Sequence, residues 1–144
     1  MTDSFRVLDL FSGAGGFSYG IDKNSHFKTL LALDFNENAL KTFKHNIPEA
    51  ETVVGDIADS NIKQTIIEKS KEHNINMIIG GPPCQGFSLK GKKLGLEDPR
   101  NFLFKEYLTI VESVQPEIFI IENVKALLST SAGWFKKQIL EKIE

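Results

Sequence analysis

The sequence predicts an α/β fold in which a mostly parallel sheet carries helices on both faces. Segments with strand and helix patterns alternate along the 144 residues, and five of them are predicted strands. These strands are continuous apolar runs, which is typical of parallel strands that are buried on both faces. The length suits one domain of ordinary size.

The first part of the chain predicts two strands and two helices. An apolar run that enters a glycine turn predicts a buried strand at Phe5–Leu10. Gly16–Lys23 can begin a helix, and Thr29–Leu33 is a second apolar run and therefore a strand. Asn36–Asn46 has apolar residues on one face and precedes Pro48, so we expect a helix that ends before this proline.

The middle of the chain predicts two further strands with a helix between them. Glu51–Val54 is a short strand, and Asn76–Ile79 is an apolar run that leads into a Gly-Pro segment. Residues 60–73 predict a helix that Ser60 caps. The inward face of this helix is expected to hold Ile62, Ile66 and Ile67.

The last part predicts a strand between two helices. Asn101–Val114 repeats apolar residues at helical spacing, and Pro116 ends the connection that follows. Ile118–Ile121 is an apolar strand, and Trp134–Ile143 has an apolar helical face without a glycine stop signal after it. The whole order is that of helices joining parallel strands.

The composition is that of a soluble globular protein. Hydrophobic residues make up 41% and charged residues 25%, and the net charge of −2 neither requires nor excludes a nucleic-acid partner. A single cysteine cannot form an internal disulfide, which fits a reducing cytoplasm. The N-terminus lacks a signal-peptide pattern, and no apolar run approaches the roughly 20 residues of a membrane span. We expect a cytoplasmic protein with no membrane contact and no bound metal.

Residues of chemical interest follow the predicted strands. They are Gly13, Asp34, Asp56, Cys84 and Glu122. In parallel sheets the ligand crevice lies outside the carboxyl ends of the strands. We therefore expect one site to collect these residues.

A glycine turn, DLFSGAGG, follows the first strand, and Asp34 lies about 20 residues after it. An acidic residue at this spacing can accept a ribose hydroxyl, so a nucleoside cofactor is expected. Ser18 stands where a dinucleotide fingerprint has its third glycine, which disfavours a nicotinamide cofactor. Phe35 could pack on adenine or in the core, and Asp56 could bind the adenine amino group or serve as a turn or cap residue.

The only cysteine, Cys84, stands in the segment GGPPCQGFS. Pro82 and Pro83 stiffen the chain before it, so its sulfur is held at a strand end and can act as a nucleophile. A buried structural cysteine is the other interpretation. Glu122 follows an apolar strand and is expected to have buried neighbours; it is either a proton donor or part of a salt bridge or helix cap.

A thiol, a carboxylic acid and a nucleoside cofactor together suit methylation of a pyrimidine ring. Its C5 becomes nucleophilic when a thiolate adds to C6 and N3 accepts a proton. The motifs DLFSGAGGF (9–17), GPPCQGFS (81–88), DPRNFLF (98–104) and ENV (122–124) resemble those of DNA (cytosine-5) methyltransferases of the bacterial restriction–modification kind. The resemblance implies a Rossmann-like S-adenosylmethionine-dependent methyltransferase fold, with residues 1–144 as the N-terminal portion of the catalytic domain.

The resemblance also implies roles for single residues. Cys84 would attack C6 of a flipped cytosine, Glu122 would hold N3 and the 4-amino group, and Asn123 would order the loop around Cys84. The residues implied for the S-adenosyl-L-methionine site are Phe11, Gly13, Gly16, Asp34, Phe35, Asp56, Ile57, Pro83 and Leu103. Asp34 stands where the family often has glutamate. The residues implied for double-stranded DNA are Gln85, Ser88, Lys90, Lys92 and Arg100; the basic ones suit phosphate contact, as well as plain solvation of a surface loop.

Later family motifs and a target-recognition domain are not found in the sequence. We therefore expect an incomplete fold: a fragment or split subunit that is inactive alone and is completed by a C-terminal chain. A tRNA cytosine-5 methyltransferase of the same family, a nicotinamide-dependent oxidoreductase and a non-catalytic binding fragment are the alternatives. The text QGFS after Cys84 favours DNA over tRNA.

Overall fold

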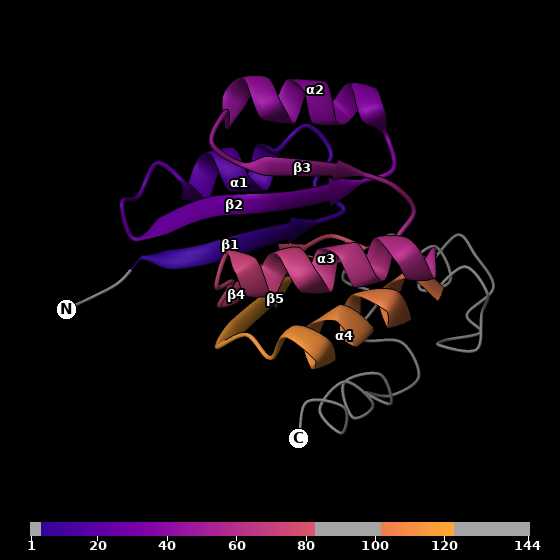
Figure 1. Cartoon of the computed structure of the whole chain (residues 1–144). Helices are drawn as coiled ribbons and strands as arrows, with labels where there is room; N and C mark the ends of the chain where they lie inside the picture. The colour runs from indigo at the N-terminus through magenta and orange to yellow at the C-terminus, as the bar shows by residue number, and fades with distance from the viewer. Residues whose placement is uncertain (1–3, 83–101, 123–144) are drawn as a thin grey trace, which may run out of the picture.

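A computed structural model describes residues 4–82 and 102–122 of the chain. Five strands and four helices alternate through these residues (Figure 1). In chain order they are β1 (Phe5–Leu10), α1 (Gly16–Ile21), β2 (Phe27–Asp34), α2 (Glu37–Asn46), β3 (Glu51–Val54), α3 (Ser60–Glu72), β4 (Met77–Gly80), α4 (Phe102–Val114) and β5 (Ile118–Ile121).

The five strands form one sheet in the order β3-β2-β1-β4-β5, and every neighbouring pair is parallel. The chain runs outward from β1 through β2 to β3 and then crosses back to β4 on the other side of β1. This reversal puts a crevice at the carboxyl ends of β1 and its neighbours, where open α/β sheets bind ligands. The predicted fold class, a Rossmann-like parallel sheet with helices on both faces, is confirmed.

Helices cover the two faces of the sheet in pairs, with α1 and α2 on one side and α3 and α4 on the other (Figure 1). The larger core lies under α3 and α4, and it contains the predicted inward residues of α3 together with Tyr107 and Leu108 of α4. Under α2 a second core forms around Phe43, and under α1 a third forms around Val7 and Ile79. The burial of these apolar side chains is the main driving force for the fold.

Most predicted element bounds agree with the structure within two residues. Strand β2 begins earlier than predicted, at Phe27, because its first residues pair with β1, where Phe27 lies opposite Phe5. The predicted cap Ser60 is wrong: Asp59 is the N-cap of α3, and its carboxylate accepts the backbone N–H groups of Asn61 and Ile62. The helix predicted at Trp134–Ile143 lies outside the described residues.

Strand β5 is less buried than its apolar sequence predicts. Ile118 and Ile120 are 41% and 38% exposed, while Phe119 and Ile121 pack against the core under α4. Among the described strands β5 lies at the edge of the sheet, so only one side of it has a neighbour. No helix in the described part of the chain is long and apolar enough to cross a membrane.

Candidate functional site

The glycine turn after β1 is a tightly wound loop with three left-handed residues. Phe11, Gly13 and Gly15 have φ angles of 57°, 54° and 92°. The two glycines adopt this conformation at little cost, whereas a left-handed Phe11 costs about 1–2 kcal/mol. Hydrogen bonds hold the turn in place: Ser12 N–H donates to the carbonyl of Leu33 (3.1 Å), and Gly13 N–H donates to a carboxylate oxygen of Asp34 (2.8 Å).

Asp34 connects this turn to the start of the next helix. One carboxylate oxygen accepts from Gly13 N–H and the other from Asn36 N–H, each at 2.8 Å. Asn36 is in turn the N-cap of α2 and accepts from Ala39 N–H. A carboxylate has lone pairs for about four hydrogen bonds, so Asp34 retains the capacity to accept from a ligand hydroxyl.

A pocket of about 530 Å³ opens beside Asp34 at the carboxyl ends of β1, β2 and β3. Its lining residues are Phe11, Leu33, Asp34, Phe35, Gly55, Asp56, Ile57 and Leu103. Six of the nine residues predicted for the cofactor are among them: Phe11, Asp34, Phe35, Asp56, Ile57 and Leu103. Leu33 and Gly55 were not predicted; each directly precedes a predicted acidic residue, so the strand-end pattern contained the signal.

The remaining predicted cofactor residues have different positions. Gly13 does not line the pocket but holds Asp34, which does. Gly16 is the first residue of α1 and is also absent from the lining. Pro83 lies outside the described residues.

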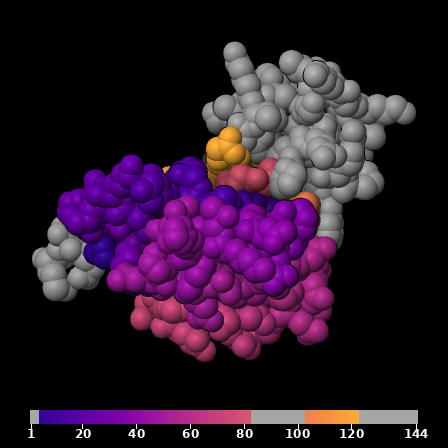
Figure 2. Space-filling model, turned by 90° about the horizontal axis from the view of Figure 1, so that it is seen from above, coloured from indigo at the N-terminus to yellow at the C-terminus, as the bar shows by residue number. Residues whose placement is uncertain are grey.

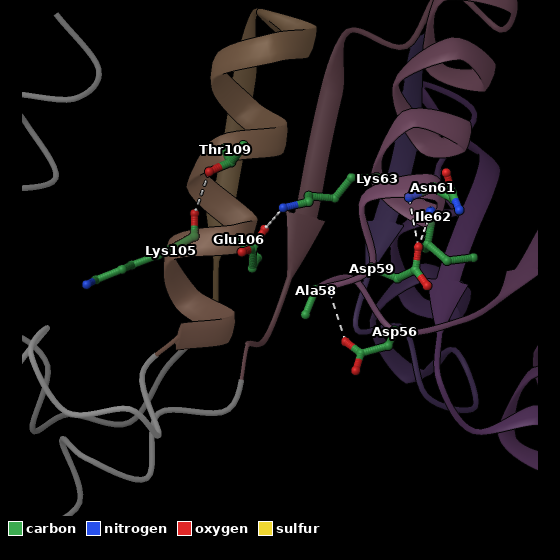
Figure 3. Close-up of polar contacts among 9 residues, drawn as sticks. All are labelled: Asp56, Ala58, Asp59, Asn61, Ile62, Lys63, Lys105, Glu106 and Thr109. Atoms are coloured by element: carbon green, nitrogen blue, oxygen red, sulfur yellow. Dashed lines mark hydrogen bonds and ion pairs between the residues drawn. The ribbon is translucent and has the colours of Figure 1, made fainter.

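The structure tests the alternative roles that the sequence left open for Phe35 and Asp56. Phe35 is 74% exposed at the pocket, so the alternative of core packing is wrong. Asp56 both lines the pocket and serves as a turn residue, because its carboxylate accepts the N–H of Ala58 at 2.8 Å (Figure 3). An exposed ring and two carboxylates therefore border one cavity.

Glu122 lies beside the end of β4. Its N–H donates to the carbonyl of Gly80 at 2.9 Å, and its carboxylate lies so close to Gly81 that a Cβ there would be 2.6 Å from Oε2. In the space-filling view the pink end of β4 and the yellow end of β5 lie together at the edge of the described surface (Figure 2). The expectation that Glu122 is surrounded by buried residues is wrong, because Glu122 is exposed and β5 is only half buried. The described residues give Glu122 no ion-pair partner.

The other predicted site residues lie outside the described ranges 4–82 and 102–122. These are the catalytic candidates Cys84 and Asn123 and the DNA-contact candidates Gln85, Ser88, Lys90, Lys92 and Arg100. Their predicted roles stay predictions. Within the described ranges no cluster of three metal-ligating side chains is found.

Asp9, a residue that sequence reasoning left without a role, lies under the glycine turn. It is 2% exposed, and it accepts a hydrogen bond of 2.6 Å from the hydroxyl of Ser18, which is the buried residue of α1. The pKa of Asp9 is raised to about 7, chiefly by burial; the hydrogen bond from Ser18 opposes this rise, and the nearby carboxylates of Asp34 and Asp22 contribute to it. Ser18 thus occupies the position of the missing third glycine and ties α1 to the centre of the sheet.

This carboxyl group makes the stability of the fold depend on pH. Its pKa is near 3.8 when the chain is unfolded and about 7 when it is folded, so the folded state holds an extra proton between these values. The free energy of unfolding therefore falls as pH rises through this window and levels off above it. We expect urea denaturation to show this fall for the wild type and a flatter profile for Asp9→Asn. If the free energy of unfolding depends on pH in the same way in both proteins, Asp9 is not the group that causes the fall.

Comparisons with known proteins agree with this arrangement. Residues 5–144 match the family model described as C-5 cytosine-specific DNA methylase. The chain is 38% identical to the type II methyltransferase M1.HphI of Haemophilus parahaemolyticus, over 98% of the chain and 38% of that protein. It is 39% identical to the type II methyltransferase M.AquIA of Picosynechococcus, over 89% of the chain and 52% of that protein. The chain thus spans about two fifths to one half of these relatives.

Solved structures give the same likeness. A DNA modification methyltransferase encoded within an Escherichia coli prophage superposes with a TM-score of 0.75 at 30% identity, over 97% of this chain and 38% of that one. A DNMT2 variant of Spodoptera frugiperda superposes with a TM-score of 0.68 at 27% identity, over 97% of this chain and 41% of that one.

Proposed function

The chain belongs to the C-5 cytosine-specific DNA methylase family, and from this premise we propose that it carries the cofactor pocket and the nucleophile of an enzyme that methylates C5 of cytosine in DNA. The observation that carries the proposal is the pocket beside Asp34, with the carboxylate of Glu122 lying over Gly81, three residues before Cys84.

The pocket suits S-adenosyl-L-methionine. Its volume of about 530 Å³ is within the usual range for small-molecule sites. We assign Asp34 to the ribose hydroxyls, Phe35 to the adenine face and Asp56 to the adenine amino group, with Phe11, Ile57 and Leu103 as apolar walls. When bound, the cofactor supplies the methyl group.

The proposed chemistry begins with Cys84. Its thiolate forms a bond to C6 of a cytosine that has left the duplex, while Glu122 gives a proton to N3, so that the ring electrons make C5 nucleophilic. After C5 is methylated, C5 gives its proton to water and N3 returns its proton to Glu122, which breaks the Cys84–C6 bond and restores the ring and the thiolate. Asn123 is assigned to ordering the segment around Cys84.

The DNA contacts belong to the segment that carries Cys84. We assign Gln85, Ser88, Lys90, Lys92 and Arg100 to the backbone of the duplex, because side chains of these types bind phosphate without reading sequence. The substrate is double-stranded DNA and the site of action is the cytoplasm. A tRNA substrate is the alternative within the same family.

We further propose that the chain needs a complementing C-terminal part for turnover. It spans 38% and 52% of the two relatives named above, so about half or more of each has no counterpart in this sequence. For activity assays we define the completed enzyme as this chain grafted in place of the part of the Haemophilus relative that it matches.

The test has two stages. Calorimetric titration of the chain alone with S-adenosylmethionine measures the pocket, and transfer of a labelled methyl group by the completed enzyme to DNA duplexes or to tRNA measures the substrate. Binding followed by transfer to DNA supports the proposal. Transfer to tRNA alone favours the alternative substrate, binding without any transfer favours a non-catalytic fragment, and absence of binding contradicts the cofactor assignment.

Alanine substitutions at the adjacent residues Gly80 and Gly81 test the role of Glu122. A Cβ on Gly81 would meet the flexible carboxylate of Glu122, whereas a Cβ on Gly80 would be 2.5 Å from the carbonyl oxygen of Leu10 and 2.8 Å from the ring of Tyr107. We expect Gly81→Ala to keep the stability within about 1 kcal/mol but to lower methyl transfer about 10- to 100-fold, because Glu122 is displaced.

The control is Gly80→Ala, which is expected to cost about 1–3 kcal/mol of folding free energy because the neighbouring backbone cannot move aside. Urea denaturation and methyl-transfer rates of the completed enzyme separate the two effects. Full activity in a stable Gly81→Ala variant would exclude Glu122 from the reaction.

A further inference from the structure

We propose that the ion pair between Lys63 and Glu106 positions the two walls of the cofactor pocket relative to each other. Lys63 belongs to α3, which follows the pocket residues Asp56 and Ile57, and Glu106 belongs to α4, which begins beside the pocket residue Leu103. Both are positioning residues, since neither lines the pocket. The inference rests on the proposed function only in that the pocket holds S-adenosylmethionine.

The pair is short and largely removed from water. Lys63 Nζ lies 2.6 Å from Glu106 Oε2, and the two side chains are 23% and 9% exposed. The side chains reach toward each other across the space between α3 and α4 (Figure 3). Residues 43 positions apart in the sequence are thereby joined at one point.

On the α3 side, hydrogen bonds connect the pair to the pocket. The Asp56 carboxylate accepts from Ala58 N–H, and the Asp56 carbonyl accepts from Asp59 N–H at 2.9 Å. Lys63 N–H donates in turn to the carbonyl of Asp59 at 3.0 Å. Backbone hydrogen bonds therefore form a path from the pocket residue Asp56 through Asp59, the N-cap of α3, to Lys63. Figure 3 shows these three residues at the start of α3.

On the α4 side the connection is one turn of helix. Leu103 and Glu106 are three residues apart, so they lie on neighbouring positions of the same helical face. Leu103 is also in the first turn of α4, where intrahelical hydrogen bonding is incomplete. A fixed contact at Glu106 therefore limits how far Leu103 can move relative to Ile57.

Stability alone gives little reason for a charged pair at this place. Desolvation of two charges offsets much of their attraction, and a well-packed apolar pair of similar volume is often equally or more stable. What an apolar pair lacks is a directional contact of fixed length. The charged pair therefore fixes the register between α3 and α4, and with it the separation of the pocket residues Ile57, just before α3, and Leu103, in the first turn of α4.

The test uses the cofactor affinity of the chain, measured by calorimetry, alongside urea denaturation. In the double variant Lys63→Met with Glu106→Leu we expect unchanged stability and about tenfold weaker S-adenosylmethionine binding. The charge swap, Lys63→Glu with Glu106→Lys, restores the contact and is expected to recover most of the affinity. If the double variant does not fold, Glu106→Gln replaces it in the test. Its side chain keeps an acceptor for Lys63, so a smaller loss of S-adenosylmethionine affinity is expected.

The control pair also has its lysine on α3. Lys69 pairs with Glu51 at the start of β3, with side chains 29% and 39% exposed, and neither residue lines the pocket. Glu51 also contacts His73 at 3.1 Å, and the variant removes this contact too. Lys69→Met with Glu51→Leu is expected to leave the affinity unchanged, because none of the three residues lines the pocket. Wild-type affinity in the Lys63 and Glu106 variants would overturn the inference while the cofactor assignment stands. Absence of binding by the wild type would instead refute the proposed function and the inference with it.

Discussion

Replacement of Cys84 by serine is expected to lower methyl transfer at least about 1,000-fold in the completed enzyme and to leave the affinity for S-adenosylmethionine unchanged. A serine hydroxyl is not ionised near neutral pH, whereas a thiol is partly ionised and is intrinsically more nucleophilic. Single-turnover transfer of a labelled methyl group measures the first effect, and calorimetric titration measures the second.

The interpretation depends on whether Cys84→Ser lowers the rate of methyl transfer, or instead the cofactor affinity or the stability of the fold. A rate loss at unchanged cofactor affinity supports a nucleophile, because the pocket lining that the structure describes holds the cofactor through other residues. A loss of affinity or of folding with little change in the rate of the bound enzyme would support a structural cysteine. Retention of more than about a tenth of the wild-type rate would contradict the covalent route.

Replacement of Asp34 by alanine is expected to weaken S-adenosylmethionine binding about 100-fold. The variant loses the acceptor for Gly13 N–H, the acceptor for Asn36 N–H and the proposed acceptor for the ribose. Hydrogen bonds to a charged group contribute about 1.5–3 kcal/mol each, and a tenfold change in affinity corresponds to about 1.4 kcal/mol. Calorimetric titration of the chain alone measures the effect.

Asp59 is the matched control for Asp34. Its carboxylate also accepts two backbone N–H groups at a helix start, from Asn61 and Ile62, but it does not line the pocket. Asp59→Ala is expected to cost about 1 kcal/mol of stability as a lost N-cap and to leave the affinity nearly unchanged. Equal losses of affinity in the two variants would mean that Asp34 acts only through the fold.

Apolar runs were sufficient to predict the strands and their direction, because a parallel buried sheet needs continuous apolar segments. They did not predict that β2 begins at Phe27, since Phe27 and Lys28 form no apolar run and join the strand only by pairing with β1. Either Asp59 or Ser60 could have capped α3 by residue type, and backbone geometry selects Asp59.

The candidate site was predictable where its residues lie at or just after the carboxyl end of a strand, as Asp34, Phe35 and Asp56 do. The exposure of Glu122 could not be predicted, because the apolar sequence of β5 is typical of a buried strand, although β5 lies at the edge of the described sheet. The pairing of Asp9 with Ser18 and of Lys63 with Glu106 also needed the structure, since these contacts join residues from different elements.

The central claim is that Cys84 attacks a cytosine of DNA while the pocket beside Asp34 holds the cofactor. The most direct measurement is covalent trapping of the completed enzyme on a duplex that carries 5-fluorocytosine, with S-adenosylmethionine present and Cys84→Ala as control. Fluorine at C5 blocks the final elimination, so a denaturation-resistant protein–DNA adduct is expected for the wild type and no adduct for Cys84→Ala. A completed enzyme that binds the cofactor but forms no adduct, or an adduct that persists in Cys84→Ala, would contradict the account.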